Sequence, residues 1–425
     1  MNISYRQPMN NQNNTNLYVD QILEPFAHQH VPEGSQVEAV VDQWKHAIAT
    51  QSQLYCNPSI INPEQLKENI ISELKDHCLY TTRRAFFNDV FGSLKLKPHF
   101  NGRFKFIDLF SGIGGLRLGF QQNRGICVFS SDFDKNAQTT YKHNHGEMPF
   151  GDITKISPIE IPDHDVLLAG FPCQPFSHAG LKLGIADTRG TLFHNITNIL
   201  EVKKPKFALL ENVKGLISHD EGHTLTVILK AITEKGYSCN IPKNIIENGS
   251  TKEIQRLAKA MVLKSKDFGV PQNRERIYIV LWRDLEIDRF SYPKPLGTAV
   301  KVGDILETKP DPTLTISDTL WRGHQRRKIE NKKKGKGFGF GLVTAQSPYT
   351  NTMSARYYKD GSEILISQAP LNPRKISPRE AARLQGFPDE FEPCPSRTQA
   401  YKQFGNSVCV KVVYELAKTI EKILD

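Results

Sequence analysis

The sequence has few cysteines, seven in 425 residues, and no two of them are spaced as Cys-x-x-Cys. An odd number of thiols without that spacing argues against a disulfide framework and a structural zinc site, and it favours a reducing compartment. The sequence also lacks the run of about eighteen apolar residues that a membrane-spanning helix needs. Its first residues, MNISYRQPMNNQNN, have neither the basic start nor the apolar core of a signal peptide. We therefore expect a cytoplasmic protein without a metal ion or membrane association.

The two charge signs are both present but unequal. The chain has 55 Lys and Arg against 45 Asp and Glu, a net charge of +10. Such an excess favours a polyanionic partner, although many basic proteins bind none. With 39% hydrophobic residues and no internal repeat, the chain is long enough for a large core and at least one further domain.

The pattern of the chain changes four times. Residues 1–16 are rich in Asn and Gln and are expected to be disordered, and residues 17–100 form a helical N-terminal extension, with helices over Val37–Ala49 and Pro63–Leu74. Over residues 101–283, short apolar runs alternate with amphipathic stretches, which predicts an α/β fold with a doubly wound, mostly parallel sheet. Residues 284–368 lose this alternation and are interpreted as a smaller inserted domain. Residues 369–425 return to the catalytic domain.

The last segment has the clearest helix signals. Ser377, Pro378 and Glu380 form the pattern of a capping box with proline in the first turn, so a helix is expected over SPREAARLQGF. A final amphipathic helix is predicted from about Val410 to Ile423.

A glycine-rich turn follows the first predicted strand. Phe106–Gly115 reads FIDLFSGIGG, in which a strand, a tight turn and a helix follow each other, so that a ligand can approach bare backbone. Asp132 ends the next strand, where a carboxylate binds ribose hydroxyls or caps the helix Asn136–His143. Asp152 follows a short turn and either accepts from an adenine amino group or serves as a turn residue.

The most informative residue is Cys173, which lies in AGFPCQPFS directly after the apolar strand DVLLAG. Ligands bind at the carboxyl ends of strands in such sheets, and a thiol between prolines is poorly placed to fill a core. Cys173 is therefore a candidate nucleophile, provided that its surroundings favour the thiolate. A buried inert thiol is the alternative, and we assign Cys127, Cys239 and Cys409 to that class.

A carboxylate is expected beside this thiol. Thirty-eight positions after Cys173, the strand KFALL ends at Glu211, which emerges at the same sheet edge. A thiol and a carboxyl group together suit addition to an electron-poor ring, whose nitrogen the acid binds or protonates. A helix cap or a surface carboxylate is the alternative. Further on, Arg274 and Arg276 lie on one side of an extended segment, where they bind phosphate, orient substrate or form salt bridges such as one to Glu275.

Taken in order, these segments resemble the DNA cytosine-5 methyltransferase family from Lys105 to the C-terminus. The blocks that carry the resemblance are FIDLFSGIGG, SSDFDKNA, GDIT, GFPCQPFS, RGTLFHNI, LLENVKGL, QNRERIYIV, SPREAARLQGFP and QFGNSV.

The resemblance implies an activity, a cofactor and a substrate. S-adenosylmethionine would transfer its methyl group to C5 of a cytosine that is flipped out of double-stranded DNA. The cofactor product would be S-adenosylhomocysteine. It implies that the thiolate adds to C6, that C5 then takes the methyl group, and that loss of the C5 proton with elimination releases the enzyme. The catalytic residues would be Cys173 as nucleophile with its neighbours Pro172 and Gln174, Glu211 as the acid at N3, and Arg274 and Arg276 as the pair that orients the substrate. The cofactor pocket would comprise Phe110, Gly112, Gly114, Asp132, Phe133, Asp152, Ile153, Leu192, Asn406 and Val408.

By the same resemblance, residues 284–368 correspond to the target recognition domain. Its basic residues Arg326, Arg327, Lys332, Lys333 and Lys334 suit phosphate contacts, and Arg356 is a candidate for reading a guanine. The stretch from Thr352 to Leu365 resembles the Dcm-like branch, which modifies CCWGG sites. Thr352-Met353 departs from the family's usual Thr-Leu, which leaves the target open.

Three other classes of protein are alternatives to this interpretation. A methyltransferase for exocyclic amines would carry an Asp/Asn-Pro-Pro-aromatic motif where this chain has Phe171–Gln174. The tRNA-methylating branch is disfavoured by the basic insertion, and an inactive DNA-binding regulator by the presence of Cys173 and Glu211. We therefore expect a monomeric, nucleoid-associated modification enzyme of a restriction-modification system, with a possible cognate endonuclease acting on the same site.

Overall fold

A computed structural model describes residues 11–172 and 192–425, which form two compact units. Within these residues, the larger unit contains the chain up to Leu263 together with Arg276–Pro293 and Tyr414–Asp425. The smaller unit contains Lys264–Glu275 and Lys294–Val413. It therefore includes residues 369–413, which the sequence pattern grouped with the catalytic domain.

The larger unit is built on a six-stranded sheet in the order β2-β1-β3-β4-β6-β5. Its strands are β1 (Phe104–Leu109), β2 (Gly125–Ser131), β3 (Val166–Gly170), β4 (Phe207–Val213), β5 (Val262–Lys264) and β6 (Glu275–Trp282). β1, β2, β3 and β4 pair in parallel, whereas β6 pairs antiparallel with β4. The strands are buried almost throughout, as expected for a sheet that helices cover on both faces.

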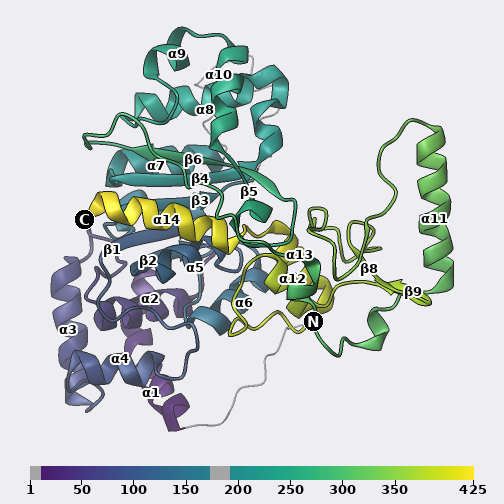
Figure 1. The fold of residues 1–425 in the computed structure, drawn as a ribbon. Coiled ribbons are helices and arrows are strands. Elements are labelled where there is room, and N and C mark those ends of the chain that lie inside the picture. The colour runs from purple at the N-terminus through teal and green to yellow at the C-terminus, as the bar shows by residue number, and fades with distance from the viewer. Residues whose placement is uncertain (1–10, 173–191) are drawn as a thin grey trace. The chain divides into compact units, whose positions relative to one another are not determined.

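Helices connect these strands in the expected alternation (Figure 1). They are α5 (Gly115–Gln122), α6 (Lys135–His145), α7 (Leu192–Lys203), α8 (His223–Glu234), α9 (Lys243–Asn248) and α10 (Thr251–Ala258), and α14 (Val410–Leu424) ends the chain. The predicted α/β class with a doubly wound, mostly parallel sheet is confirmed. So is the final helix, which extends one residue further than expected.

The antiparallel strand β6 departs from a simple parallel alternation, and its direction matters for the site. It pairs Glu211 with Tyr278 and Val213 with Arg276. Because β6 runs against β4, its amino end lies at the carboxyl end of β4. Arg276 is thereby brought to the edge of the sheet where the parallel strands end.

The N-terminal extension consists of α1 (Asn11–Ala27), α2 (Val37–Thr50), α3 (Pro63–Asp76) and α4 (Arg83–Phe91), which gather on the β1–β2 side of the sheet in Figure 1. The helices predicted within residues 37–49 and 63–74 are confirmed. α1 begins at Asn11, so helix replaces the disorder expected up to residue 16. The reason is tertiary: Val19, Leu23 and Ala27 are fully buried and belong to the same apolar cluster as the sheet.

The smaller unit contains α11 (Asp318–Lys333), β7 (Leu342–Val343), β8 (Leu365–Gln368), β9 (Leu371–Arg374), α12 (Pro378–Leu384) and α13 (Arg397–Asn406). The capping box of α12 is confirmed, since Ser377 Oγ accepts from Glu380 N–H at 3.1 Å and Ser377 N–H donates to the Glu380 carboxylate at 2.8 Å. No sequence pattern predicted the sixteen-residue helix α11. It is polar on nearly every side and fully buries only His324, so it carries no apolar periodicity.

Three further features concern the reactivity of cysteines, metal binding and membrane-spanning helices. Cys127, Cys239 and Cys409 are buried as expected, and burial raises the pKa of the Cys127 thiol to about 12 and that of Cys239 to about 11, which favours the unreactive thiol form. Over residues 11–172 and 192–425, no group of three or more His, Cys, Asp and Glu side chains is arranged to hold a metal ion. The same part of the chain has no helix with both the length and the apolar character needed to cross a membrane.

Three buried histidines make stability depend on pH. Burial lowers the pKa of His164 to about 4, and burial together with the charge of Arg117 lowers the pKa of His46 and His145 well below the usual value. In the unfolded chain each titrates near pH 6.5, so below that pH the unfolded state binds more protons than the folded state. Stability is therefore complete above about pH 6.5 and falls as the pH decreases, by up to about 1.4 kcal/mol per pH unit for each histidine.

Thermal unfolding between pH 7.5 and 5 measures this effect. The midpoint should fall with pH in the wild type and fall less steeply in a His164→Asn variant. His28→Gln, which changes an exposed histidine, is the matched control and should follow the wild type. Equal slopes for His164→Asn and the wild type would contradict the assignment.

Candidate active site

The strand that precedes Cys173 ends in a fixed position. β3 ends at Gly170, and Phe171 is buried with its ring 5.8 Å from that of Phe193. The side-chain amide of Asn212 donates to the carbonyl of Phe171 at 2.9 Å. Pro172 is exposed at the carboxyl end of the sheet, and Cys173 and Gln174 lie outside the described residues. The chain therefore reaches residue 173 from the sheet edge where ligands bind in such folds.

Glu211 lies next to this point. Its backbone pairs with Gly170 of β3, and its Oε2 lies 3.7 Å from where a Cβ on Gly170 would be. The residue is only 8% exposed, and its Oε1 is 3.2 Å from Arg276 Nε. Glu211 is therefore a buried, paired carboxylate, and the alternatives of a helix cap or a surface carboxylate are wrong.

The two arginines predicted as a pair have different partners. Arg276 binds Glu211, but Arg274 is 1% exposed and donates to the carbonyls of Met353, Gly405 and Ser407 within the smaller unit. Arg274 therefore holds the backbone of the smaller unit through these three carbonyls. The Glu275 carboxylate lies 3.4 Å from Lys264 Nζ.

The glycine turn after β1 leaves room for a ligand. Phe110, Gly112 and Gly114 all have positive φ, and a Cβ added to Gly112 would meet no atom within 4 Å. Gly112 N–H donates to Asp132 Oδ2 at 2.7 Å, and Asp134 N–H donates to Oδ1 at 2.8 Å. Open space beside bare backbone is what a ligand-binding turn requires.

Asp132 does not cap α6, because the N-cap of that helix is Asp134, whose carboxylate accepts from Asn136 N–H and Ala137 N–H. Burial raises the pKa of Asp132, and the N–H groups of Asp134 and Gly112 partly oppose this rise. The next residue, Phe133, is 74% exposed although it is a large aromatic side chain. The fixed carboxylate at the end of β2 is suited to bind ribose hydroxyls. The exposed ring beside it is suited to stack on an aromatic base.

The remaining predicted cofactor residues of the larger unit lie on neighbouring segments. Asp152 caps the short 3-10 helix η2 (Ile153–Lys155), because its Oδ1 accepts from Thr154 N–H at 2.9 Å. This bond through one oxygen is compatible with an adenine contact through the other. Ile153 is buried, and Leu192 begins α7. Phe150 N–H donates to the carbonyl of Ser130 at 2.9 Å, which places the segment before Asp152 against the end of β2.

In the smaller unit, Asn406 is the exposed last residue of α13 and Val408 is buried. The carbonyls of Gly405 and Ser407, one on each side of Asn406, both accept from Arg274. Arg274 thus holds the backbone that presents Asn406.

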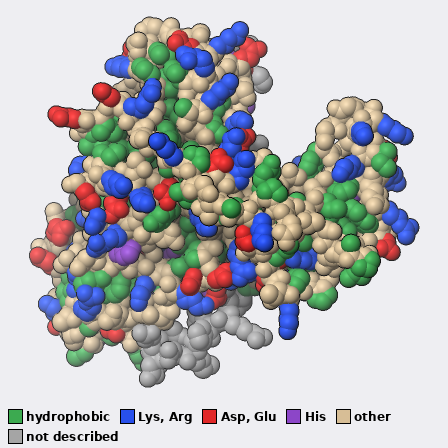
Figure 2. All heavy atoms as spheres, in the orientation of Figure 1, with side chains coloured by type: hydrophobic (Ala, Val, Ile, Leu, Met, Phe, Trp, Pro, Cys, Tyr) green, Lys and Arg blue, Asp and Glu red, His purple; other side chains and the backbone are tan. Residues whose placement is uncertain are grey.

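The predicted DNA contacts of the smaller unit are mostly on its surface. Figure 2 shows Lys and Arg side chains along the region of α11, and the exposed residues among those predicted are Arg326, Lys332, Lys333, Lys334 and Arg356. Arg327 differs, because both of its terminal nitrogens lie 3.0 Å from Asp360 Oδ2.

Two polar residues near the site were not singled out from the sequence. Asn212 follows Glu211 and holds Phe171, as described above. Asp108, on β1 before the glycine turn, is fully buried, and burial raises its pKa well above the usual value although Arg117 opposes the rise. In the sequence, Asp108 is marked only as a polar residue within the apolar strand FIDLF. That signal does not predict which group it interacts with.

A mostly parallel sheet with a glycine turn after β1 and an acid after β2 defines an enzyme fold that binds a nucleotide-like cofactor. The family described as C-5 cytosine-specific DNA methylase matches residues 104–422. The chain therefore belongs to this family and is a DNA cytosine-5-methyltransferase that uses S-adenosylmethionine.

Two relatives are similar over most of their length. The type II methyltransferase M.NlaX of Neisseria lactamica is 57% identical over 324 residues, which cover 76% of this chain and 97% of that protein. The type II methyltransferase M.SsoII of Shigella sonnei is 54% identical over 329 residues, covering 76% and 82%. Both relatives are named type II methyltransferases.

Solved structures support the fold. The Dnmt2 methyltransferase of S. pombe aligns with a TM-score of 0.57 at 22% identity, covering 74% of this chain and 97% of that structure. A DNMT2 mutant of Spodoptera frugiperda aligns with a TM-score of 0.58, also at 22% identity, covering 75% and 99%. At this identity, the likeness concerns the fold alone.

Proposed function

We propose that this enzyme methylates C5 of a cytosine flipped out of a specific double-stranded DNA sequence, with Cys173 as nucleophile and Glu211 as the acid at N3. The observation that carries the proposal is the position of Glu211. It is buried, paired with Arg276 and adjacent to Gly170, three residues before Cys173 along the chain. A target carbon inside a duplex is out of reach of these groups, so the base must leave the stack.

The steps assign each group a task. The Cys173 thiolate adds to C6, and the electron pair of the C5–C6 double bond moves into the ring, where Glu211 binds N3 and holds a proton there. Arg276 fixes the Glu211 carboxyl group through Nε. C5 then takes the methyl group, a base removes the C5 proton, and the C6–sulfur bond breaks to restore the double bond and the thiolate.

Bound S-adenosylmethionine supplies the methyl group as an electrophile. The residues that fit it are the turn Phe110–Gly114, which is open at Gly112, the acid Asp132 for the ribose, Phe133 for the adenine ring, and Asp152 and Ile153 for its edge. Leu192, Asn406 and Val408 complete the set, as the family resemblance implies.

The exposed cations of the smaller unit are proposed to contact the DNA backbone, with Arg356 as the candidate for base readout. Arg327 is the weakest of these candidates, because Asp360 already binds its guanidinium. The target is proposed to be CCWGG-like. We further propose a monomeric enzyme of the cytoplasm that modifies DNA in a restriction-modification system with a cognate endonuclease.

Replacing Lys332, Lys333 and Lys334 together by alanine should weaken binding to all DNA sequences alike. Each lost phosphate contact lowers the steepness of log Kd against log salt by about 0.9, so the triple variant should lose up to about 3. Binding titrations at several salt concentrations measure this. The matched control changes three exposed lysines with the same loss of charge: Lys243 of α9, Lys252 of α10 and Lys259, which directly follows α10. A changed target preference at an unchanged salt slope would contradict the assignment to phosphate contacts.

Bisulfite sequencing of genomic DNA from cells that express the chain tests the proposed function. Protected cytosines should occur at one short sequence and be absent with a Cys173→Ala variant. An unmethylated genome combined with methylated tRNA would instead support the tRNA-methylating alternative.

A further inference from the structure

The N-terminal extension holds the segment that leads to Asp152. This connector, residues 146–152, runs from the end of α6 to η2. Two hydrogen bonds fix it: Asp42 Oδ2 accepts from Met148 N–H at 3.0 Å, and Ser35 Oγ accepts from Gly151 N–H at 2.9 Å. His46 also packs nearby, with Nε2 3.4 Å from Glu147 Oε1. Each partner belongs to the extension, more than 100 positions earlier in the chain.

The packing at these contacts is tight. A Cβ added to Gly151 would lie 2.3 Å from the carbonyl oxygen of Gly34, so only glycine permits this approach. The ring of Tyr55 lies 4.4 Å from that of Phe150, and Phe150 also stacks on Phe129 of β2. The connector is therefore enclosed between the extension and the sheet.

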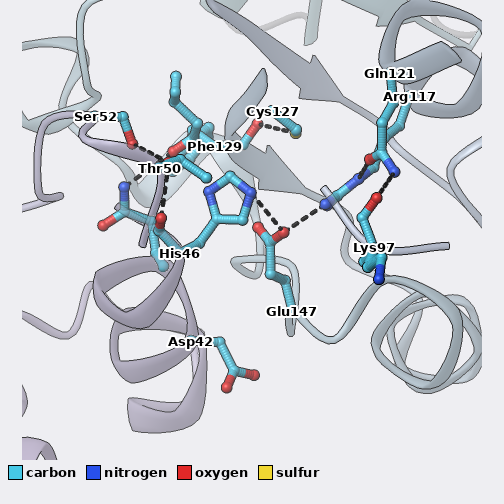
Figure 3. A network of polar contacts seen from close by, with 12 residues as sticks. Asp42, His46, Thr50, Ser52, Lys97, Arg117, Gln121, Cys127, Phe129 and Glu147 are labelled. Atoms are coloured by element: carbon cyan, nitrogen blue, oxygen red, sulfur yellow. Dashed lines mark hydrogen bonds and ion pairs between the residues drawn. The ribbon is translucent and has the colours of Figure 1, made fainter. Parts of the chain in front are cut away.

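A buried ionic network continues from these contacts into the larger unit (Figure 3). Glu147 lies between His46 of α2 and Arg117 of α5, whose Nη2 donates to the same Oε1. Arg117 also donates to Gln121 and to Tyr141. Because α5 begins at the glycine turn, the network joins the extension to both cofactor segments.

The extension lies outside the residues that match the family. The family match begins at residue 104, and M.NlaX aligns over 97% of its own length while covering 76% of this chain. That relative is therefore too short to contain a counterpart of the whole extension. Here the extension supplies contacts to a segment that M.NlaX must hold by other means.

We propose that the N-terminal extension is part of the cofactor-binding apparatus, with Ser35 as a positioning residue that sets the Gly151–Asp152 backbone for S-adenosylmethionine. This inference rests on the proposed role of Asp152 in the cofactor pocket. Ser35 acts through the backbone N–H of Gly151. Its loss should therefore weaken cofactor binding and leave the chemical step unchanged.

Titration calorimetry with S-adenosylhomocysteine tests this on the full chain. Ser35→Ala should raise the Kd by about 3- to 10-fold, the loss expected for one hydrogen bond, and Ser35→Thr, which keeps the hydroxyl group, should restore most of the affinity. Ser59→Ala is the matched control, because Ser59 is an exposed serine of the same extension. Melting curves without cofactor verify that the variants are folded.

Steady-state kinetics separate positioning from a general loss of structure. Ser35→Ala should raise the KM for S-adenosylmethionine by a similar factor at an unchanged kcat, whereas partial unfolding would lower kcat at constant KM. Asp152→Asn distinguishes the inference from the proposed function on which it rests. If Asp152→Asn weakens binding but Ser35→Ala stays within about twofold of the wild type, the inference is overturned. If Asp152→Asn also leaves the Kd unchanged, the role of Asp152 itself is wrong.

Discussion

Glu211→Gln should lower the rate of methyl transfer by about 10²- to 10⁴-fold, the usual contribution of a positioned acid. Glutamine retains the shape of the side chain but cannot transfer a proton to N3, and it loses the ion pair between Oε1 and Arg276. The negative charge that enters the ring when the thiolate adds to C6 would then lack its partner. Single-turnover methylation of target DNA with tritiated S-adenosylmethionine measures the loss.

Binding data make this result specific. Glu211 is not among the residues proposed to contact the cofactor, so the Kd of S-adenosylhomocysteine should stay close to the wild-type value. Glu201→Gln is the matched control, because it removes a glutamate that pairs with Lys235 away from the carboxyl edge of the sheet. Wild-type turnover by Glu211→Gln would contradict the acid role, and lost cofactor binding would show a wider structural defect.

Cys173→Ala should reduce methyl transfer by about 10⁴-fold or more, because without the sulfur no addition to C6 activates C5. DNA binding and cofactor binding should survive, since both depend on other residues. Cys78→Ala is the control, since it removes an exposed thiol elsewhere in the chain. Substantial methylation by Cys173→Ala would contradict the nucleophile assignment.

The sequence predicted the strands and helices of the larger unit well, because a mostly parallel sheet leaves strong local signals. Each buried strand is a short apolar run, and each covering helix is amphipathic, as in β3 and α7. The direction of β6 carried no such signal. An apolar strand reads alike in both directions, so only the pairing of β6 with β4 showed why Arg276 reaches Glu211.

The interaction partners of charged residues were harder to predict from the sequence than the positions of these residues at the strand ends. Asp132 and Asp134 are two letters apart, and both follow a strand. Only the hydrogen bonds show that Asp134 caps α6 while Asp132 binds the glycine turn. Arg274 and Arg276 are equally close, yet one fixes three carbonyls and the other binds a carboxylate. Alternation along a strand predicts the side of a residue but not what lies opposite it.

The role of residues 17–100 could not be found from the sequence at all. The contacts from Ser35 and Asp42 to the connector span more than 100 positions, and neither residue belongs to a motif. In the sequence, Ser35 and Asp42 look like ordinary polar residues of a loop and a helix. Their role follows from the segment that they contact, which only the structure shows.

Covalent trapping tests the central claim, catalysis through a Cys173–C6 adduct, most directly. In DNA that carries 5-fluorocytosine at the target, fluorine replaces the C5 proton that must leave, so elimination is blocked after methyl transfer. The wild type with S-adenosylmethionine should form a complex that survives denaturing electrophoresis, with a mass equal to protein plus methylated DNA and a link that maps to Cys173. No such complex with methylation-competent enzyme, or a link at another residue, would contradict the account.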